Sequence, residues 1–297
     1  MRWLARIVSA CAALLLAAPS AFGAISVSDD SGRSITLPQP AQRIVSLAPH
    51  ATEILFAAGA GQHIVGVTEY SDFPPAARDI SSVGSGVALD LERIVRLKPD
   101  LVVAWESGNS APQVARLEAL GIPVYRSEPH DFAAIAATME KLGRLTGTPA
   151  AGESNAANFR ARLAQLQARY RHRPRVTVFY QIWRSPLMTL NGEHMVSAAL
   201  DLCGGENIFA SLPQLAPTVG IESVLQADPD AIIASSGARE DGLAQWRRFP
   251  KLKAVAMGNL LVVDGNLLNR PGPRVLDGVE ALCRLLDTVR EKRQSKR

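Results

Sequence analysis

The sequence predicts an α/β protein built as two α/β lobes with mainly parallel sheets, joined by one long α-helix. Three observations support this fold class. Apolar segments of strand length alternate with amphipathic segments of helix length over most of the 297-residue chain, which is typical of layered α/β folds. One uninterrupted helical pattern lies near the middle of the chain. A similar segment occurs on each side of it.

The segment Thr148–His172 is the predicted linker helix. Its apolar side chains recur at the spacing that places them on one helical face, namely Phe159, Leu163, Leu166 and Tyr170. After Pro149, the next proline is Pro174. A surface helix inside a single domain would show the same periodicity, so the flanking sequences have to decide between the two interpretations.

The flanking sequences resemble each other. The segments 91–104 and 221–234, LERIVRLKPDLVVA and IESVLQADPDAIIA, align without a gap. The matching positions include Glu92 with Glu222, Pro99 with Pro229, and Asp100 with Asp230. A constant register on both sides of the helix favours two related lobes. We expect the N-terminal lobe at 24–147, the linker helix at 148–173 and the C-terminal lobe at 174–297.

The predicted N-terminal lobe starts with a β-hairpin at 25–37, where apolar and polar residues alternate around a polar turn. Apolar runs bounded by turn residues predict strands at 43–48, 63–68, 101–105 and 122–127. Amphipathic segments predict helices at 51–60, 89–100, 113–121 and 132–147. Asp90 is a suitable N-cap, and Pro49 and His50 are expected to separate the first strand from its helix. Residues 69–86 are expected to form an irregular loop.

The predicted C-terminal lobe repeats this alternation. Strands are expected at 175–182, 231–235 and 260–265. Helices are expected at 194–205, 220–230 and 275–294. The order of strands and helices again indicates a mainly parallel sheet.

Residues 1–23 have the pattern of a secretory signal peptide. Arg2 and Arg6 precede an apolar run that ends at Pro19, and small residues precede a cleavage point near Gly23. The run is short for a membrane span. Within it, VSAC resembles a lipoprotein cleavage box, but most of the apolar run follows Cys11 rather than preceding it.

Composition excludes several classes of function. With 47% hydrophobic and 20% charged residues, the chain is globular rather than disordered. Loss of Arg2 and Arg6 lowers the formal charge from +4 to about +2, and the only basic run is the C-terminal EKRQSKR. We therefore expect no nucleic-acid partner.

The two cysteines of the mature chain, Cys203 and Cys283, suggest one disulfide in an exported protein, with two buried thiols as the alternative.

Loops that follow parallel strands line a cleft at the carboxyl edge of each sheet. Only 5% of the residues are aromatic, yet Tyr70, Phe73, Trp105 and Trp183 all fall in such loops or at a strand end. Each ring stacked on a planar ligand would contribute about 0.5–1.5 kcal/mol beyond its buried area. Asn266, Asn269 and Arg270 add hydrogen-bond donors for amides or phosphates after the last strand, although they would also suit a turn.

Four segments carry a family resemblance: RIVSLAPHATEILFAAGAG, GVTEYSDFPP, LERIVRLKPDLVVAW and DLCGGENIF. Together they resemble the periplasmic substrate-binding proteins of ABC importers for cobalamin, iron-siderophores and haem, with the strongest likeness to the cobalamin binders. The resemblance extends over roughly residues 43–289. It implies two lobes on one rigid helix, a periplasmic location, capture of cobalamin in the cleft and delivery to an ABC importer permease dimer in the inner membrane.

The resemblance also implies roles for single residues. The implied ligand-binding positions are Tyr70, Trp105, Asn266, Leu267, Leu268, Asn269 and Arg270. Asn266 stands where the cobalamin binders have an aspartate, and Gly86, Met188 and Ala216 stand where they have aromatic residues. Met188 keeps its place in the expected pocket, and we expect Trp183 to compensate for the missing rings. Cys203 and Cys283 fall on the family disulfide.

Glu92 and Glu222 fall on two carboxylates that meet arginines of the permease, one from each lobe. Repeat-related carboxylates would also suit a two-fold symmetric partner with cationic pockets on physical grounds alone. The alternative is that each is simply a favourable acid in the first turn of a helix.

The five histidines form no ligand cluster in the sequence, so we expect no direct metal site. His50, predicted to lie in a loop facing the cleft, is the candidate axial ligand to a bound metal chelate, alongside the phenol of Tyr70. A capping or polar lining role is the alternative. We expect a monomer that needs no cofactor besides its cargo.

The main competing functions are a haem or ferric-siderophore binder on the same fold and a secreted two-lobe hydrolase. Siderophore binding would favour several arginines in the cleft, where Arg184 and Arg270 are the main candidates. No GxSxG, HExxH, phosphate-binding or CxxC motif supports an enzyme.

Overall fold

Two four-stranded parallel sheets form the two halves of the molecule in the computed structural model, which describes residues 23–236 and 242–295. The N-terminal sheet has the order β4–β3–β5–β6, with β3 Ile44–Ser46, β4 Ile64–Val67, β5 Leu101–Trp105 and β6 Val124–Ser127. The C-terminal sheet has the order β10–β9–β7–β8, with β7 Val176–Gln181, β8 Gly205–Asn207, β9 Ala231–Ser236 and β10 Leu260–Asp264. The predicted fold class is confirmed. The predicted signal peptide up to residue 22, including Cys11, lies outside the described residues.

Helices cover both sheets. The N-terminal lobe contains α1 Pro49–Ala57, α2 Leu91–Arg96, α3 Ala111–Ala119 and α4 Phe132–Leu145. The C-terminal lobe contains α6 Met195–Leu202, α7 Ile221–Ala227, α8 Lys253–Ala256, α9 Gly265–Leu268 and α10 Val275–Ser295. Short 3-10 helices occur at Gly61–His63, Pro75–Asp79 and Ala244–Arg248. None of the helices within the described ranges is long and apolar enough to cross a membrane.

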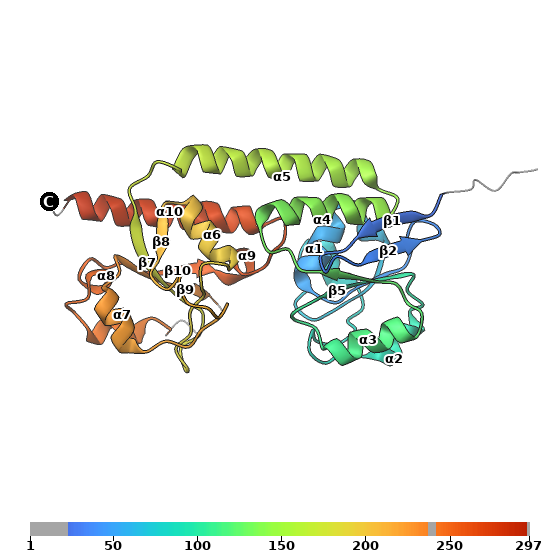
Figure 1. Ribbon diagram of the computed structural model, residues 1–297, viewed down its shortest axis with the longest axis horizontal. Helices are drawn as coiled ribbons and strands as arrows, with labels where there is room; N and C mark the ends of the chain where they lie inside the picture. The colour runs from blue at the N-terminus through green and yellow to red at the C-terminus, as the bar shows by residue number, and fades with distance from the viewer. Residues whose placement is uncertain (1–22, 237–241, 296–297) are drawn as a thin grey trace, which may run out of the picture.

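The predicted hairpin is present as β1 Ile25–Ser28 and β2 Ser34–Leu37, which pair antiparallel. The Asp29 carboxylate accepts the backbone N–H groups of Ser31 at 3.0 Å and Arg33 at 2.9 Å, which closes the turn. Gly32 has φ +83° there, a conformation that residues with a Cβ rarely adopt. The hairpin lies beside α4 at the edge of the N-terminal lobe (Figure 1).

The long helix α5, Pro149–Tyr170, extends along one side of the molecule over both lobes (Figure 1). Its predicted apolar face is confirmed, because Phe159, Leu166 and Tyr170 are buried and Leu163 is partly buried. Gly152 lets α5 approach α4 closely, since a Cβ there would lie 2.6 Å from the carbonyl oxygen of Met139. The core is therefore continuous from one lobe to the other beneath α5.

Ion pairs also attach α5 to both lobes. The Arg160 guanidinium contacts the Glu140 carboxylate of α4. Arg162 contacts two carboxylates of α10, Asp277 at 2.6 Å and Glu280 at 3.0 Å. Such partly exposed pairs contribute little energy each, so packing of the apolar face supplies most of the attachment.

The repeated segments occupy equivalent places in the two lobes. Asp100 accepts the backbone N–H groups of Gln42 and Arg43 at 2.8 and 2.9 Å, just before β3. Asp230 accepts the N–H of Thr177 at 3.1 Å, at the start of β7. The turns before these aspartates also match, since Lys98 has φ 47° and Asp228 has φ 44°. Each copy thus fixes the start of its neighbouring central strand.

Cys203, which follows α6, forms a disulfide with Cys283 of α10, with 4.8 Å between their Cα atoms. Both cysteines are buried, and because their sulfur atoms are bonded to each other, the alternative of two buried thiols is wrong. The bond closes a loop of 80 residues. In the chain-entropy model a loop of that length contributes about 4–5 kcal/mol.

Three local predictions needed correction. Pro49 and His50 do not separate the strand from the helix but form the first turn of α1, because proline is tolerated at the first helical position. Strand β8 was not expected, because its sequence Gly-Glu-Asn is short and polar; pairing with β7 creates it. Helix α9 was expected to be a loop, but Asp264 caps it by accepting the N–H of Asn266 at 2.8 Å.

Candidate ligand-binding cleft between the lobes

A cavity of about 130 Å³ lies between the lobes. The N-terminal lobe contributes Trp105 at the end of β5, Ser107 after it, and Glu128, Pro129 and His130 after β6. The C-terminal lobe contributes Glu193, His194, Met195, Leu215, Leu268, Asn269 and Pro271. Of the predicted ligand contacts, Trp105, Leu268 and Asn269 border this cavity. The segments 128–130 and 193–195 were missed, although 128–130 follows a strand and the rule used for the other loops would have included it.

Three large aromatic side chains are exposed in loops at the carboxyl ends of strands, Tyr70 and Phe73 after β4 and Trp183 after β7. Tyr70 is 77% exposed on the N-terminal lobe, and Trp183 is 55% exposed on the C-terminal lobe. Tyr70 has φ 64°, an uncommon conformation for a bulky residue and one that recurs at functional sites. Trp183 pairs with Met188 in an isolated antiparallel bridge, and its indole N–H donates to the carbonyl of Ser185 at 3.0 Å.

Trp105 is held in place by polar contacts rather than by burial alone. Its backbone N–H donates to Asn109 Oδ1 at 2.7 Å, and its indole N–H lies 3.4 Å from Glu128 Oε1. The Asn109 amide also donates to the carbonyls of Leu47 at 2.9 Å and Gly86 at 2.8 Å. Asn109 therefore joins the loop after β5 to the end of β3 and to the loop that contains Gly86. The sequence offered no signal for this role beyond its position after a strand.

His50 does not lie in a loop facing the cleft, as the sequence had indicated. It occupies the first turn of α1, is only 3% exposed, and packs edge-on against Trp105 with ring centroids 5.6 Å apart. Nε2 lies 3.5 Å from Ser127 Oγ. Burial, with the positive charge of Arg270, lowers the pKa of His50 to about 4, so the ring is neutral at pH 7.

The segment after β10 carries the remaining predicted contacts. The Asn269 side-chain oxygen accepts the hydroxyl of Tyr180 at 2.9 Å. Arg270 donates to Asp72 Oδ1 and to Asn266 Oδ1, each at 2.8 Å. Leu268 is buried, whereas Leu267 is partly exposed.

Arg270 also acts on the acid beside it. Burial alone would raise the pKa of Asp72, but the hydrogen bond and charge of Arg270, with the charge of Arg274, lower it overall. Asp72 is therefore an anion at neutral pH, and the predicted donor Arg270 is already engaged by it.

Glu92 and Glu222 lie in the first turns of α2 and α7 and are both exposed. Glu92 contacts Arg96 one turn later at 2.7 Å. Helices α2 and α7 lie at the ends of the two lobes that point away from α5 (Figure 1). The two carboxylates are thus presented from equivalent elements on the same side of the molecule.

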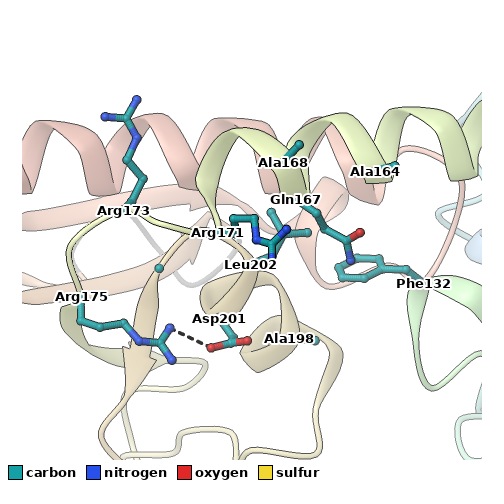
Figure 2. A pocket seen from close by; sticks show the side chains of 11 residues that line it. Phe132, Ala164, Gln167, Ala168, Arg171, Arg173, Arg175, Ala198, Asp201 and Leu202 are labelled. Atoms are coloured by element: carbon teal, nitrogen blue, oxygen red, sulfur yellow. Dashed lines mark hydrogen bonds and ion pairs between the residues drawn. The ribbon is translucent and has the colours of Figure 1, made fainter.

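A larger hollow, of about 810 Å³, lies beneath α5, between α6 and the segment leading into β7 (Figure 2). Figure 2 shows Arg171 and Arg175 beside it, with Arg175 paired to Asp201 at 2.8 Å. Most of its lining side chains are exposed, and Phe132 is the only aromatic residue among them. It also lies at the amino end of β7, opposite to the cleft loops, so its geometry differs from that of the ligand sites of α/β folds.

The described ranges, 23–236 and 242–295, contain no group of three or more His, Cys, Asp or Glu placed to hold a metal ion. The imidazole of His130 is exposed at the cavity, whereas His194 accepts the N–H of Val196 at 3.1 Å and caps α6. Burial lowers the pKa of His194 to about 4. The groups that line the cleft can stack on a planar ligand and form hydrogen bonds with it.

Residues 44–267 match the family model described as periplasmic binding protein. The vitamin B12-binding protein of Vibrio campbellii is 39% identical over 256 residues, which cover 86% of this chain and 92% of that protein. The crystal structure of the periplasmic vitamin B12 binding protein of Vibrio cholerae is 40% identical, with a TM-score of 0.78 over 84% of this chain and 98% of that one.

A periplasmic haem binding protein from Pseudomonas aeruginosa is 28% identical, with a TM-score of 0.70 over 82% of this chain and 91% of that one. Matches of this extent, together with the family model over most of the sequence, identify the family. The chain belongs to the periplasmic binding proteins.

Proposed function

We propose that this chain captures cobalamin in the cleft between its lobes and delivers it to an ABC importer permease in the inner membrane. The observation that carries the proposal is the exposure of Tyr70 and Trp183 beside the cleft, in a chain about 40% identical to vitamin B12-binding proteins. Aromatic rings left exposed on both lobes suit a ligand with a broad planar face.

The size of the cavity supports a particular mode of binding. Its volume of about 130 Å³ is small for a ligand pocket, which typically measures roughly 300–1,000 Å³. A corrinoid would therefore rest mainly in the open cleft on Tyr70 and Trp183, with only an edge or side group reaching toward Trp105. Asn266 and Arg270 would serve the amide groups at its rim, and Leu267 and Met188 would add apolar contact.

Haem is the alternative ligand, and one observation favours it. The phenol of Tyr70 and the imidazole of His130 are both exposed in loops of the cleft, and both groups ligate haem iron in proteins. His50 is a weaker candidate for ligation because its ring is covered by Trp105 and Ser127. A ferric siderophore has less support, because Asp72 balances the charge of Arg270 that an anionic siderophore would need, whereas neutral amides need only its N–H donors.

Transport requires a second contact, with the permease. Glu92 and Glu222 would each enter a cationic pocket on one half of a permease dimer, setting the orientation and rate of docking. Export through a signal peptide cleaved near Gly23 would bring the chain to the periplasm as a monomer. It would need no resident cofactor for this role.

The test is a set of calorimetric titrations of the mature chain, beginning at Ala24, with cyanocobalamin, haemin and a ferric hydroxamate siderophore. We expect cyanocobalamin to bind with micromolar or tighter affinity and one-to-one stoichiometry. Binding of haemin at that affinity without binding of cyanocobalamin would replace the proposal with the haem alternative. For a haemin complex, an absorption spectrum that stays the same in His50→Ala would exclude ligation by His50.

A further inference from the structure

Four charged side chains connect the lobes beside the cleft, and we call them the inter-lobe cluster. Glu53 of α1 and Asp72 of the loop after β4 belong to the N-terminal lobe. Arg270 and Arg274, between α9 and α10, belong to the C-terminal lobe. The cluster contains two carboxylates and two guanidinium groups, so its formal charges balance.

Glu53 makes the most buried contacts of the cluster. Its carboxylate accepts two hydrogen bonds from Arg274, from Nε at 3.0 Å and from Nη2 at 2.6 Å. This bidentate contact fixes the orientation of the guanidinium group relative to the carboxylate. Only 3% of the Glu53 side chain is exposed. The ring of Phe73 lies under the Arg274 guanidinium at 3.9 Å, so a second group of the N-terminal lobe holds the same arginine.

The backbone between the two arginines is shaped to admit Glu53. A Cβ on Gly272 would lie 3.2 Å from Glu53 Oε2, closer than most side chains tolerate. Glycine at this position therefore lets the segment come close to the carboxylate. The contact depends on the main chain of one lobe and a buried side chain of the other.

The same carboxylate also acts on Arg270. Arg270 Nη1 lies 3.7 Å from Glu53 Oε1 and 2.8 Å from Asp72 Oδ1, while Nη2 donates to Asn266 at 2.8 Å. Without the charge of Glu53, two guanidinium groups would share Asp72, whose side chain is 47% exposed. Their mutual repulsion would then favour separation of the segment from the N-terminal lobe.

We propose that Glu53 is a positioning residue, which ties the segment Arg270–Arg274 to the N-terminal lobe and so fixes both the width of the cleft and the orientation of Arg270 toward the ligand. The lobes are then held at two places, by α5 along one side and by the inter-lobe cluster beside the cleft. The effect on cleft width is independent of the ligand, whereas the effect on affinity rests on the proposed binding of cobalamin.

The width of the cleft can be measured by spin-label distances in the unliganded protein. Val87 and Val262 are exposed on opposite lobes and do not line the cavity, and the native Cys203 and Cys283 are paired and buried, so Val87→Cys with Val262→Cys gives two selective labelling sites. In Glu53→Gln, we expect a longer and broader distance distribution than in the parent. An unchanged distribution would overturn the proposal.

A matched control variant and a second variant show whether a change in distance comes from the contact between the lobes. Glu118 contacts Arg33 and Arg126 within the N-terminal lobe, so Glu118→Gln removes an ion-paired carboxylate without touching the lobe contact and should leave the distance unchanged. Arg274→Gln removes the same pair from the other lobe and should lengthen the distance as Glu53→Gln does. The double variant should add little to either single change, because both remove one interaction. Additive changes would contradict the pairing.

The affinity is measured on unlabelled proteins with cyanocobalamin. We expect Glu53→Gln to weaken binding at least 5-fold while Glu118→Gln binds like the parent. Equal affinities in Glu53→Gln and the parent would contradict the claim that Glu53 orients Arg270, whatever the spin-label distances show. If the parent itself does not bind cyanocobalamin, the proposed function fails, and the distance measurement still decides the role of Glu53 in cleft width.

Discussion

Tyr70 and Trp183 are the side chains that most directly express the proposed function. Both are large, aromatic and exposed, and each lies in a loop that follows a parallel strand, where ligand sites of α/β folds occur. Replacement of either by alanine should weaken cyanocobalamin binding about 2- to 10-fold, the equivalent of one lost ring stack. The measurement is calorimetric titration. Leu120→Ala, which removes an exposed apolar side chain at the end of α3, is the matched control.

If neither Tyr70→Ala nor Trp183→Ala binds more weakly than Leu120→Ala, the stacking surface lies elsewhere. The single substitutions also divide the site between the lobes. A loss confined to Trp183→Ala would place the ligand against the C-terminal lobe alone and contradict capture between the lobes.

His50 makes the stability of the protein depend on pH. Its pKa is lowered to about 4 in the fold, from about 6.5 in an unfolded chain, because burial and the charge of Arg270 disfavour the cation. Between these two values the unfolded chain binds more protons than the folded one. The free energy of unfolding should therefore fall as the pH drops from 6.5 to 4, by roughly 3 kcal/mol for this group.

Urea unfolding between pH 7 and pH 4 measures this dependence. His194 shifts in the same direction and adds to it in the same window. The variant His50→Gln should show a shallower fall than the parent, because it cannot take up the proton. The same slope in parent and variant would mean that His50 does not carry the effect.

Some residues of the candidate site could be predicted from the sequence, and others could not. Aromatic rings after strands stood out because aromatics are few, and Tyr70, Trp105 and Trp183 could be named in advance. Glu53 and Asn109 could not, because a helical glutamate and a loop asparagine are common. Their roles arise from tertiary contacts with Arg274 in the other lobe and with two distant backbone carbonyls.

At the scale of secondary structure, each repeated helix–strand unit contains an aspartate that binds the backbone at the start of a neighbouring strand. Asp100 receives two backbone N–H groups at the start of β3, which would otherwise lack those partners. Asp100→Ala should lower the free energy of unfolding by about 1–3 kcal/mol. Chemical denaturation measures the change, with Asp79→Ala, an exposed aspartate of the same lobe, as the control. If Asp100→Ala is as stable as Asp79→Ala, Asp100 does not stabilise the start of β3.

Element prediction succeeded where local sequence and tertiary packing agree. The long helix α5 has a continuous apolar face and a packed core beneath it, so periodicity alone located it. Strand β8 exists because β7 offers a pairing edge, and no property of Gly-Glu-Asn indicates a strand. Helix α9 depends on the Asp264 cap at a place where the sequence also suits a turn.

At the scale of the whole molecule, the pseudo-symmetry of the lobes leads to a prediction about docking to the permease. Glu92 and Glu222 project from equivalent helices at the ends of the lobes (Figure 1). Replacing both with alanine should leave cyanocobalamin affinity unchanged but impair ligand transport by the cognate permease in proteoliposomes. The control is Glu153→Ala, an exposed acid on α5. Weaker binding of the ligand itself by the double variant would refute the docking role.

The location of the ligand is the central claim for the whole molecule. Crystals of the cyanocobalamin complex, measured at the cobalt absorption edge, would place the metal through its anomalous scattering. The account predicts a single cobalt between the lobes, in the cleft bordered by Tyr70 and Trp183. A cobalt in the hollow beneath α5, beside Arg171 and Arg175, or at any site within one lobe would contradict the proposed binding between the lobes.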